Sequence, residues 1–172
     1  KQLEINNFSS LTDISNIIQN IDSLKNLEIN KCSSLIELSN INYLEKLKVY
    51  DCISLSIIKD IDIIEILEII KCNSLILIEN IYVIKQFKIK RCNSIEIINN
   101  IDHVNDLIII KCKSLKTIDV NGSKKNIDSV YSLTIKICKS LKNIIGIYNE
   151  LTIHNCKSLE EIPVDNIYED LT

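Results

Sequence analysis

Cysteine recurs at a regular interval along this chain of 172 residues. The first five cysteines lie 20 residues apart, and the last two follow at intervals of 26 and 18 residues: Cys32, Cys52, Cys72, Cys92, Cys112, Cys138 and Cys156. A fixed interval of this length is typical of a repeat array, in which each repeat forms one structural unit that packs on its neighbours. The cysteines therefore define the frame in which the rest of the chain is compared.

Seven apolar positions recur in each unit when the cysteines are aligned. In one unit they are Leu44, Leu47, Val49, Cys52, Leu55, Ile58 and Ile61, and two units later they are Ile84, Phe87, Ile89, Cys92, Ile95, Ile98 and Ile101. A further copy opens the chain, with Phe8 at the cysteine position and Ile17 as its last apolar residue. We therefore expect about eight units, whose seven shared positions point inwards.

Two spacings alternate within each unit. Leu47 and Val49 are two residues apart, which predicts a β-strand. Leu55, Ile58 and Ile61 are three residues apart, which fits an extended, polyproline-like or 3₁₀ path, whereas an α-helix would alternate spacings of three and four. We therefore expect a strand followed by an extended return path, with little α-helix.

The repeated pattern LxxLxIxxCxSLxxI resembles the leucine-rich-repeat signature LxxLxLxxN/CxL over the whole chain. This resemblance implies an α/β-type leucine-rich-repeat solenoid, which is a right-handed curved array. Its concave side is a parallel β-sheet of about eight strands, and its convex side is extended or 3₁₀ with little α-helix. We interpret residues 1–172 as a single leucine-rich-repeat domain of about eight repeats. Ligands of this family usually bind on the concave sheet.

Composition and charge limit the function classes. The hydrophobic content of 46% is enough for a folded core. The net charge of −3 and the lack of a dense Lys/Arg patch predict no binding of nucleic acid. Charged residues interrupt every apolar run before the roughly 20 residues that cross a bilayer, so we expect no membrane insertion.

The chain contains no Met and opens in the middle of a repeat. We therefore expect a fragment of a longer array or protein. Neither end shows a polar capping sequence, and an open last turn would expose apolar surface. Missing flanking sequence is the favoured cover, and the tail from Pro163 to Thr172 is the alternative.

The cysteines are interpreted as core residues. They share one inward position, their number is odd, and a free cysteine behaves as a small hydrophobe. No CxxC pair is present, so we expect no zinc or other metal site and no disulfide framework. Reduced thiols favour a cytoplasmic protein, whereas the sequons at Asn7 and Asn121 leave an extracellular one open.

Turn residues account for most of the other recurring polar side chains. A serine lies two residues after each cysteine position, and asparagine recurs at Asn16, Asn40, Asn80 and Asn100. One turn is longer, because the segment from Asp119 to Ser129 carries six extra residues. We favour a tolerated surface loop over a contact loop for this insertion.

Neither catalysis nor a cofactor is expected. His103 and His154 are far apart in the repeat frame, and neither has an evident nucleophile as partner. With Gly122 and Gly146 as the only glycines, the chain cannot form a phosphate-binding loop. We therefore predict that the chain is not an enzyme.

The outward residues of the strands form columns across the predicted concave face. The middle column alternates in charge and should pair across neighbouring strands: Glu4, Glu28, Lys48, Glu68, Lys88, Ile108, Thr134 and Thr152. Bulky apolar groups beside it favour a protein-binding patch, against a scatter of exposed isoleucines that reflects biased composition. The candidate partner-binding residues are Tyr50, Ile66, Ile70, Lys88, Lys90, Ile108 and Ile110.

A basic edge beside the cysteines is formed by Lys31, Lys71, Arg91 and Lys111 and interrupted by Asp51. We interpret this edge as a solvated rim, with an acidic partner as the alternative.

Three functions follow from these observations. The leading hypothesis is a protein–protein interaction module that binds a protein partner on the concave face. The first alternative is the recognition or sensor domain of a larger effector ligase or immune-type receptor. The second is a structural or self-associating solenoid, because open ends and an apolar face can pair with further copies.

Overall fold

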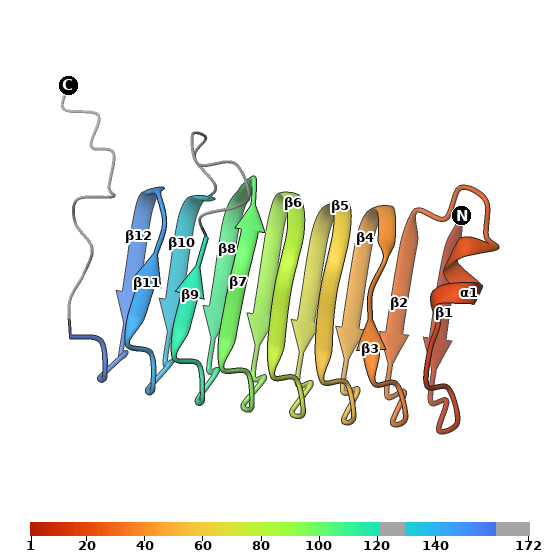
Figure 1. The fold of residues 1–172 in the computed structure, drawn as a ribbon, viewed down its shortest axis with the longest axis horizontal. Coiled ribbons are helices and arrows are strands. Elements are labelled where there is room, and N and C mark those ends of the chain that lie inside the picture. Colours follow the sequence, from red (N-terminus) through yellow and green to blue (C-terminus); the bar gives the residue numbers. More distant parts are fainter. Residues whose placement is uncertain (121–129, 161–172) are drawn as a thin grey trace.

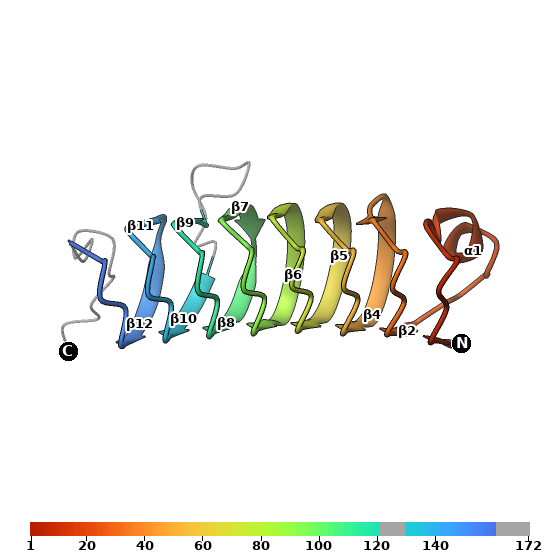
Figure 2. The ribbon, with the colours of Figure 1, turned by 90° about the horizontal axis from the view of Figure 1, so that it is seen from below.

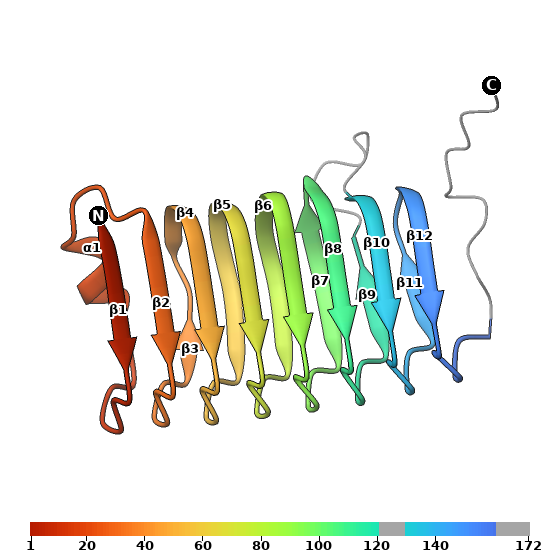
Figure 3. The ribbon, with the colours of Figure 1, turned by 180° about the vertical axis from the view of Figure 1, so that it is seen from behind.

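The period-two segment of each repeat is a β-strand that pairs in parallel with the same segment of the neighbouring repeats. The coordinates are a computed structural model, which describes residues 1–120 and 130–160. Eight such strand segments lie side by side and form the front layer, which faces the viewer in Figure 3. They are β1 (Gln2–Asn6), β2 (Asn26–Asn30), β8 (Val104–Ile110), β10 (Val130–Lys136), β12 (Tyr148–His154) and the carboxyl-terminal parts of β4 (Ile41–Tyr50), β5 (Ile57–Ile70) and β6 (Leu77–Lys90).

In the described turns after the first, the return path is extended, as predicted, and forms a back layer of shorter parallel strands (Figure 1). This layer contains β3 (Glu37–Leu38), β7 (Ile97–Asp102), β9 (Thr117–Asp119), β11 (Asn143–Ile145) and the amino-terminal parts of β5 and β6. No 3₁₀ helix occurs in the described residues, because their backbone groups bond to the adjacent turns instead. The single described helix is α1 (Ser15–Gln19).

Figure 2 shows the two layers face to face, with each turn of the chain crossing from one to the other. The turns stand in a row with little curvature in Figures 1 and 2, so we name the layers front and back rather than concave and convex. The predicted parallel solenoid, with a sheet of about eight strands and little helix, is confirmed.

The core lies between the layers and consists of the seven repeated apolar positions. Each of these seven is at most 1% exposed in the unit that runs from Leu44 to Ile61. Front-layer strands alternate buried and half-buried residues, as in β2, where Leu27 and Ile29 are buried. Because a single turn buries these side chains only against its neighbours, the stability of the array depends on contact between turns.

Residues with a left-handed backbone turn the chain at two fixed positions of the repeat. One lies directly before each cysteine, with φ between 54° and 60°: Lys31, Asp51, Lys71, Arg91, Lys111, Ile137 and Asn155. A second group turns the chain within the back layer, with φ between 52° and 56°: Asn40, Asp60, Asn80 and Asn100. Asn and Asp tolerate this conformation because their short polar side chains bond locally.

Three residues of the second group, Asp60, Asn80 and Asn100, also form a side-chain ladder. Asn100 Nδ2 donates to Asn80 Oδ1 at 2.6 Å, and Asn80 Nδ2 donates to Asp60 Oδ1 at 2.8 Å. The predicted turn function of Asn40, Asn80 and Asn100 is therefore confirmed. Asn16 differs, because it lies in α1.

The prediction that Ile84 points inwards is wrong. Val83 is fully buried in its place, whereas Ile84 is 39% exposed. The pairing of β5 with β6 shifts register on either side of Ile64, which pairs with Val83. Such an irregularity turns the next side chain to the other face of the sheet, and apolar spacing alone cannot locate it when two adjacent residues are both apolar.

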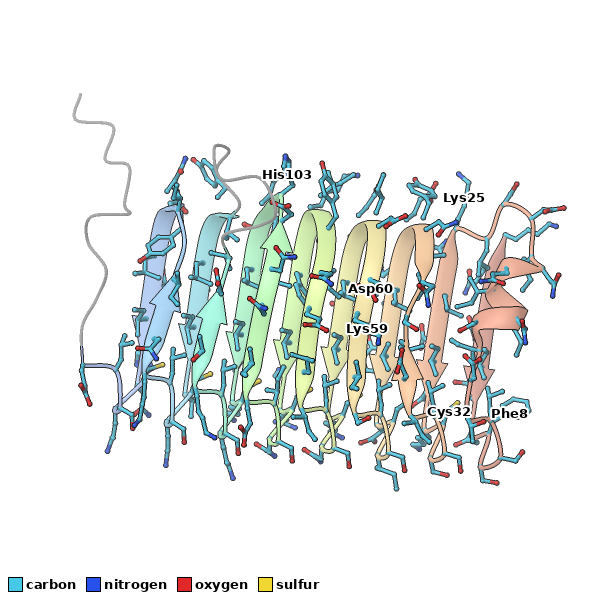
Figure 4. All side chains as sticks on the ribbon, in the orientation of Figure 1. Phe8, Lys25, Cys32, Lys59, Asp60 and His103 are labelled. Carbon is cyan, nitrogen blue, oxygen red and sulfur yellow. The ribbon has the colours of Figure 1, made fainter. Side chains whose placement is uncertain are left out.

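The prediction that the first repeat buries Phe8 and Ile17 is also wrong, although β1 keeps its register with β2. Phe8 is 53% exposed and Ile17 is 38% exposed, and Figure 4 shows Phe8 at the same edge as Cys32. A phenyl ring is much larger than the thiol that fills this position in the next turn. Moreover, α1 takes the place of a back-layer strand in this turn, so less of its apolar surface is covered.

Two sequence predictions lie outside the described residues. The insertion is described only at Asp119 and Val120, and residues 121–129 are not. The tail from Pro163 to Thr172 likewise falls outside the described range.

The left-handed residue Ile137 yields a stability prediction. Its φ of 60° is unfavourable for a β-branched side chain, at a cost of roughly 1–2 kcal/mol. We expect Ile137→Asn to raise the free energy of unfolding by about 1 kcal/mol, since Asn adopts this conformation more readily. Urea denaturation with an unchanged slope would measure the gain.

Ile145→Asn serves as the matched control. Ile145 is 43% exposed in β11 and is not among the residues with positive φ, so this variant should show no gain. Equal or lower stability of Ile137→Asn would show that the backbone at this turn is not strained.

Candidate functional site

The outward face of the front layer carries all seven predicted partner-binding residues. The strand register places their positions in three columns, which run across β4, β5, β6 and β8. One column holds Tyr50, Ile70, Lys90 and Ile110, the middle column holds Lys88 and Ile108, and the third holds Ile66. All seven side chains are half-buried. The structure therefore brings the predicted residues together on one surface.

The middle column is the predicted charge ladder, in the predicted register from Glu4 to Thr152. Lys48 Nζ lies 4.0 Å from Glu28 Oε2, and Lys88 Nζ lies 3.6 Å from Glu68 Oε1. Partly exposed pairs of this kind contribute little to stability. They do neutralise one another, so the central strands of the face carry little net charge along this column.

Tyr50 is held by this charge ladder. Its hydroxyl donates to Glu68 Oε2 at 2.9 Å, and Lys48 Nζ lies 5.9 Å from the centre of its ring. Burial and the hydrogen bond to Glu68 raise the pKa of Tyr50 above its ordinary value. The ring therefore stays a neutral, fixed aromatic group at one end of the candidate surface.

The four isoleucines of the candidate surface form two pairs rather than one continuous patch. Ile66 and Ile70 belong to β5, whereas Ile108 and Ile110 belong to β8. β6 lies between them and presents Lys88 and Lys90. The surface is thus apolar at two neighbouring places that a pair of lysines separates.

Two groups of exposed bulky apolar residues lie elsewhere and were not predicted as site residues. One group lies beside the inward residues that open the front-layer strands: Tyr43, Ile63, Ile84 and Tyr131, which are 39–53% exposed. Another lies on or next to the back layer: Ile36, Ile76, Ile97 and Ile145, which are 42–53% exposed. The sequence did contain a signal for these residues. Each is an apolar residue directly next to an inward one, at a position that the repeat frame does not require to be apolar.

The cysteines line the turn edge of the core, as predicted. Six are fully buried, Cys156 in the last described turn is half-buried, and all seven are free thiols. Each Sγ lies 3.4–3.8 Å from the carbonyl oxygen two residues earlier. A thiol is small enough for this position and can donate weakly to that carbonyl, which explains why cysteine recurs here.

The environment of Cys32, Cys72 and Cys156 suppresses the thiolate form. Burial is the main cause that raises the pKa of Cys32 and of Cys156. The contact with Cys52 lowers the pKa of Cys72, but the contact with Cys92 and burial outweigh it and raise this pKa to about 12. Because the thiolate is the reactive species, these cysteines suit packing rather than chemistry.

The two histidines lie at opposite edges of the solenoid. His103 precedes β8 at the corner labelled in Figure 4, with its ring stacked on Tyr82 at 4.7 Å and its Nδ1 3.5 Å from Asp102 Oδ1. His154 ends β12 at the cysteine edge. Within the described ranges, no group of three or more His, Cys, Asp or Glu side chains is arranged to hold a metal ion.

No known protein family, curated protein or solved structure matches this chain. In the part of the chain that the structure describes, no helix has the length and apolar character needed to cross a bilayer.

Thiol reactivity tests whether the cysteines are buried in the folded protein. We expect Cys156 to react first with a thiol reagent in the folded protein, because it alone is half-buried. The other six should react only as the protein unfolds. Mass spectrometry after timed labelling would count and locate the modified residues.

Cys156→Ser is the control for this experiment, because it should remove the fast reaction and leave the slow one unchanged. Rapid labelling of Cys72 or Cys92 in folded protein would contradict the buried arrangement.

Proposed function

We propose that this protein is a protein–protein interaction module of the leucine-rich-repeat type, which binds a protein partner on the front layer. The proposed contact surface is centred on Tyr50, Ile66, Ile70, Lys88, Lys90, Ile108 and Ile110. The observation that carries this proposal is the register that gathers these residues on one rigid sheet face.

The size and rigidity of the front layer favour binding of a protein rather than of a small molecule. Eight strands at a spacing of about 4.8 Å give a face roughly 35 Å wide, which suits a standard protein interface. A preformed sheet loses little conformational freedom when a partner binds.

The chemistry of the surface also supports a protein partner. Interface centres favour aromatic and bulky apolar groups and carry few unpaired charges. Here Tyr50 is fixed by Glu68, and the charges of the middle column pair with one another. Ile70 and Ile110 stand on either side of Lys90 in one column, where a partner can cover both.

Self-association is a second candidate, which a separate observation favours. Tyr43, Ile63, Ile84 and Tyr131 expose apolar groups outside the front face, and apolar surface of this kind favours contact between copies. A molar mass that rises with concentration in light scattering would support this function. A constant monomer mass would exclude it under the conditions used.

The proposed setting is cytoplasmic, because free thiols persist under reducing conditions. In that setting the module would serve as the recognition part of a larger protein or act on its own, and no catalytic function is proposed for it.

Binding of a partner tests the proposed surface. A partner is first identified by affinity capture from cells that make this protein, and its affinity is then measured with purified components. We expect Ile70→Glu and Ile110→Glu each to weaken binding at least tenfold, which is about 1.4 kcal/mol, because a buried charge would replace an apolar contact.

Ile97→Glu is the matched control. Ile97 is 42% exposed in the back layer, so this variant has the same change of charge on the opposite side and should bind normally. Unchanged affinity of Ile70→Glu and Ile110→Glu in folded protein would refute the proposed surface.

A further inference from the structure

Positive charge gathers on the edge of the solenoid that carries the cysteine turns, in its last four described turns. We propose that this edge binds a short acidic segment of a protein, in which several Asp or Glu residues lie within an extended stretch of chain. The residues that form this basic strip are Lys90, Arg91, Lys111, Lys113, Lys136, Lys139 and Lys157. The proposal does not depend on the front-layer function.

Strand register places these residues on neighbouring turns. Lys90, at the end of β6, pairs with Ile110 in β8, which pairs with Lys136 in β10. The backbone N–H of Arg91 donates to Ile110 O at 2.9 Å, and that of Lys111 donates to Lys136 O at 2.9 Å. In Figure 4, nitrogen-tipped side chains project from this lower edge. Four turns at about 4.8 Å make the strip roughly 14 Å long.

The cations of the strip have no carboxylate partner among the described residues, whereas many other lysines do. Lys25, Lys85 and Lys116 form ion pairs of 2.5–2.8 Å with Glu45, Glu65 and Glu96, each one turn away. None of the seven strip residues forms an ion pair within residues 1–120 and 130–160. Lys90 is half-buried and the other six are exposed.

The amino-terminal limit of the strip is set by an ion pair. Lys71 Nζ lies 3.9 Å from Asp51 Oδ2, so Asp51 both interrupts the predicted basic edge and neutralises its neighbour. Beyond Lys71, the stretches 88–93, 108–113, 134–139 and 154–159 contain no Asp or Glu. The strip is therefore cationic and its four stretches contain no carboxylate side chain, on a chain whose net charge is −3.

Like charges follow one another from turn to turn in this strip. Lys113, Lys139 and Lys157 each follow a cysteine, so the register that aligns the cysteines aligns these side chains on successive turns. Like charges on neighbouring turns repel one another, although exposure to water weakens the repulsion. An anionic partner would offset this repulsion, because it places negative charge along the whole strip.

The dimensions of the strip favour a short acidic peptide segment over a nucleic acid. A length of roughly 14 Å matches about four extended residues. A longer polyanion would gain little beyond the strip on its amino-terminal side, where Asp51 neutralises Lys71. The four stretches that form the strip contain no Phe, Tyr or Trp on which bases could stack.

A labelled peptide with six consecutive glutamates tests this proposal by fluorescence anisotropy with the whole chain. We expect binding at about 0.01 M ionic strength, where the Debye length is roughly 30 Å, and weaker binding at about 0.15 M, where it is roughly 8 Å. Lys136→Glu/Lys139→Glu should lower the affinity at least tenfold. Neither residue has positive φ, so the turns should fold unchanged, and a thermal melt checks this.

Lys1→Glu/Lys46→Glu is the matched control, because it makes the same change of net charge at positions away from the strip. Its affinity for the peptide should fall less than threefold. Ile66→Glu changes the front layer and should leave the affinity for the peptide unchanged. The strip proposal therefore holds even if the front-layer proposal fails. The proposal is overturned by any of three results: no binding by the unmodified protein at low ionic strength, equal losses in the strip and control variants, or at least tenfold tighter binding of a single-stranded oligonucleotide or of heparin.

Discussion

The structure depends on contact between equivalent residues of successive turns. A turn of about 20 residues is too short to enclose its own apolar side chains, so each turn is stable only when its strands bond to the strands on either side. The left-handed residues before the cysteines and at Asn40, Asp60, Asn80 and Asn100 bring the chain back to the same register each time. Once that register is fixed, every side chain lies beside its equivalent one turn away. Packing, charge pairing and surface chemistry all follow from this constraint.

The part of the fold that repeats was predictable from sequence because the same residue type returns to the same environment. The cysteine interval identified the turn, the period-two pair identified the front strand, and the inward frame from Leu44 to Ile61 was correct at every position. The errors fall where the repeat breaks. Val83 and Ile84 are both apolar, and only the irregular pairing of β5 with β6 decides which one is buried. Phe8 keeps the cysteine register, but its ring is too large for that position.

The candidate surface was predictable to the same extent and for the same reason. Alternation along the strands predicted which residues face outwards, and the parallel register aligned the middle column from Glu4 to Thr152. Spacing could not show that Tyr50 bonds to Glu68, since a tyrosine side chain reaches across to the next strand. Nor could it show that Lys88 and Lys90 divide the isoleucines into two pairs, because their separation depends on which strands are neighbours. The exposed apolar residues beside the start of the front-layer strands, such as Tyr43 and Ile63, were missed. They fit neither the two-residue nor the three-residue spacing.

This register places charged side chains, as well as apolar ones, at equivalent positions of successive turns. In the amino-terminal turns, lysine and glutamate alternate from one turn to the next, so the stacking yields pairs such as Lys25 with Glu45 and Lys48 with Glu28. In the carboxyl-terminal turns, lysine repeats at the position after the cysteine, so the same repeat places like charges on neighbouring turns. Packing does not require this arrangement, because serine, isoleucine and asparagine stand at that position in earlier turns. The core therefore explains the cysteines but not the lysines beside them, and those lysines are the part of this edge that packing leaves unexplained.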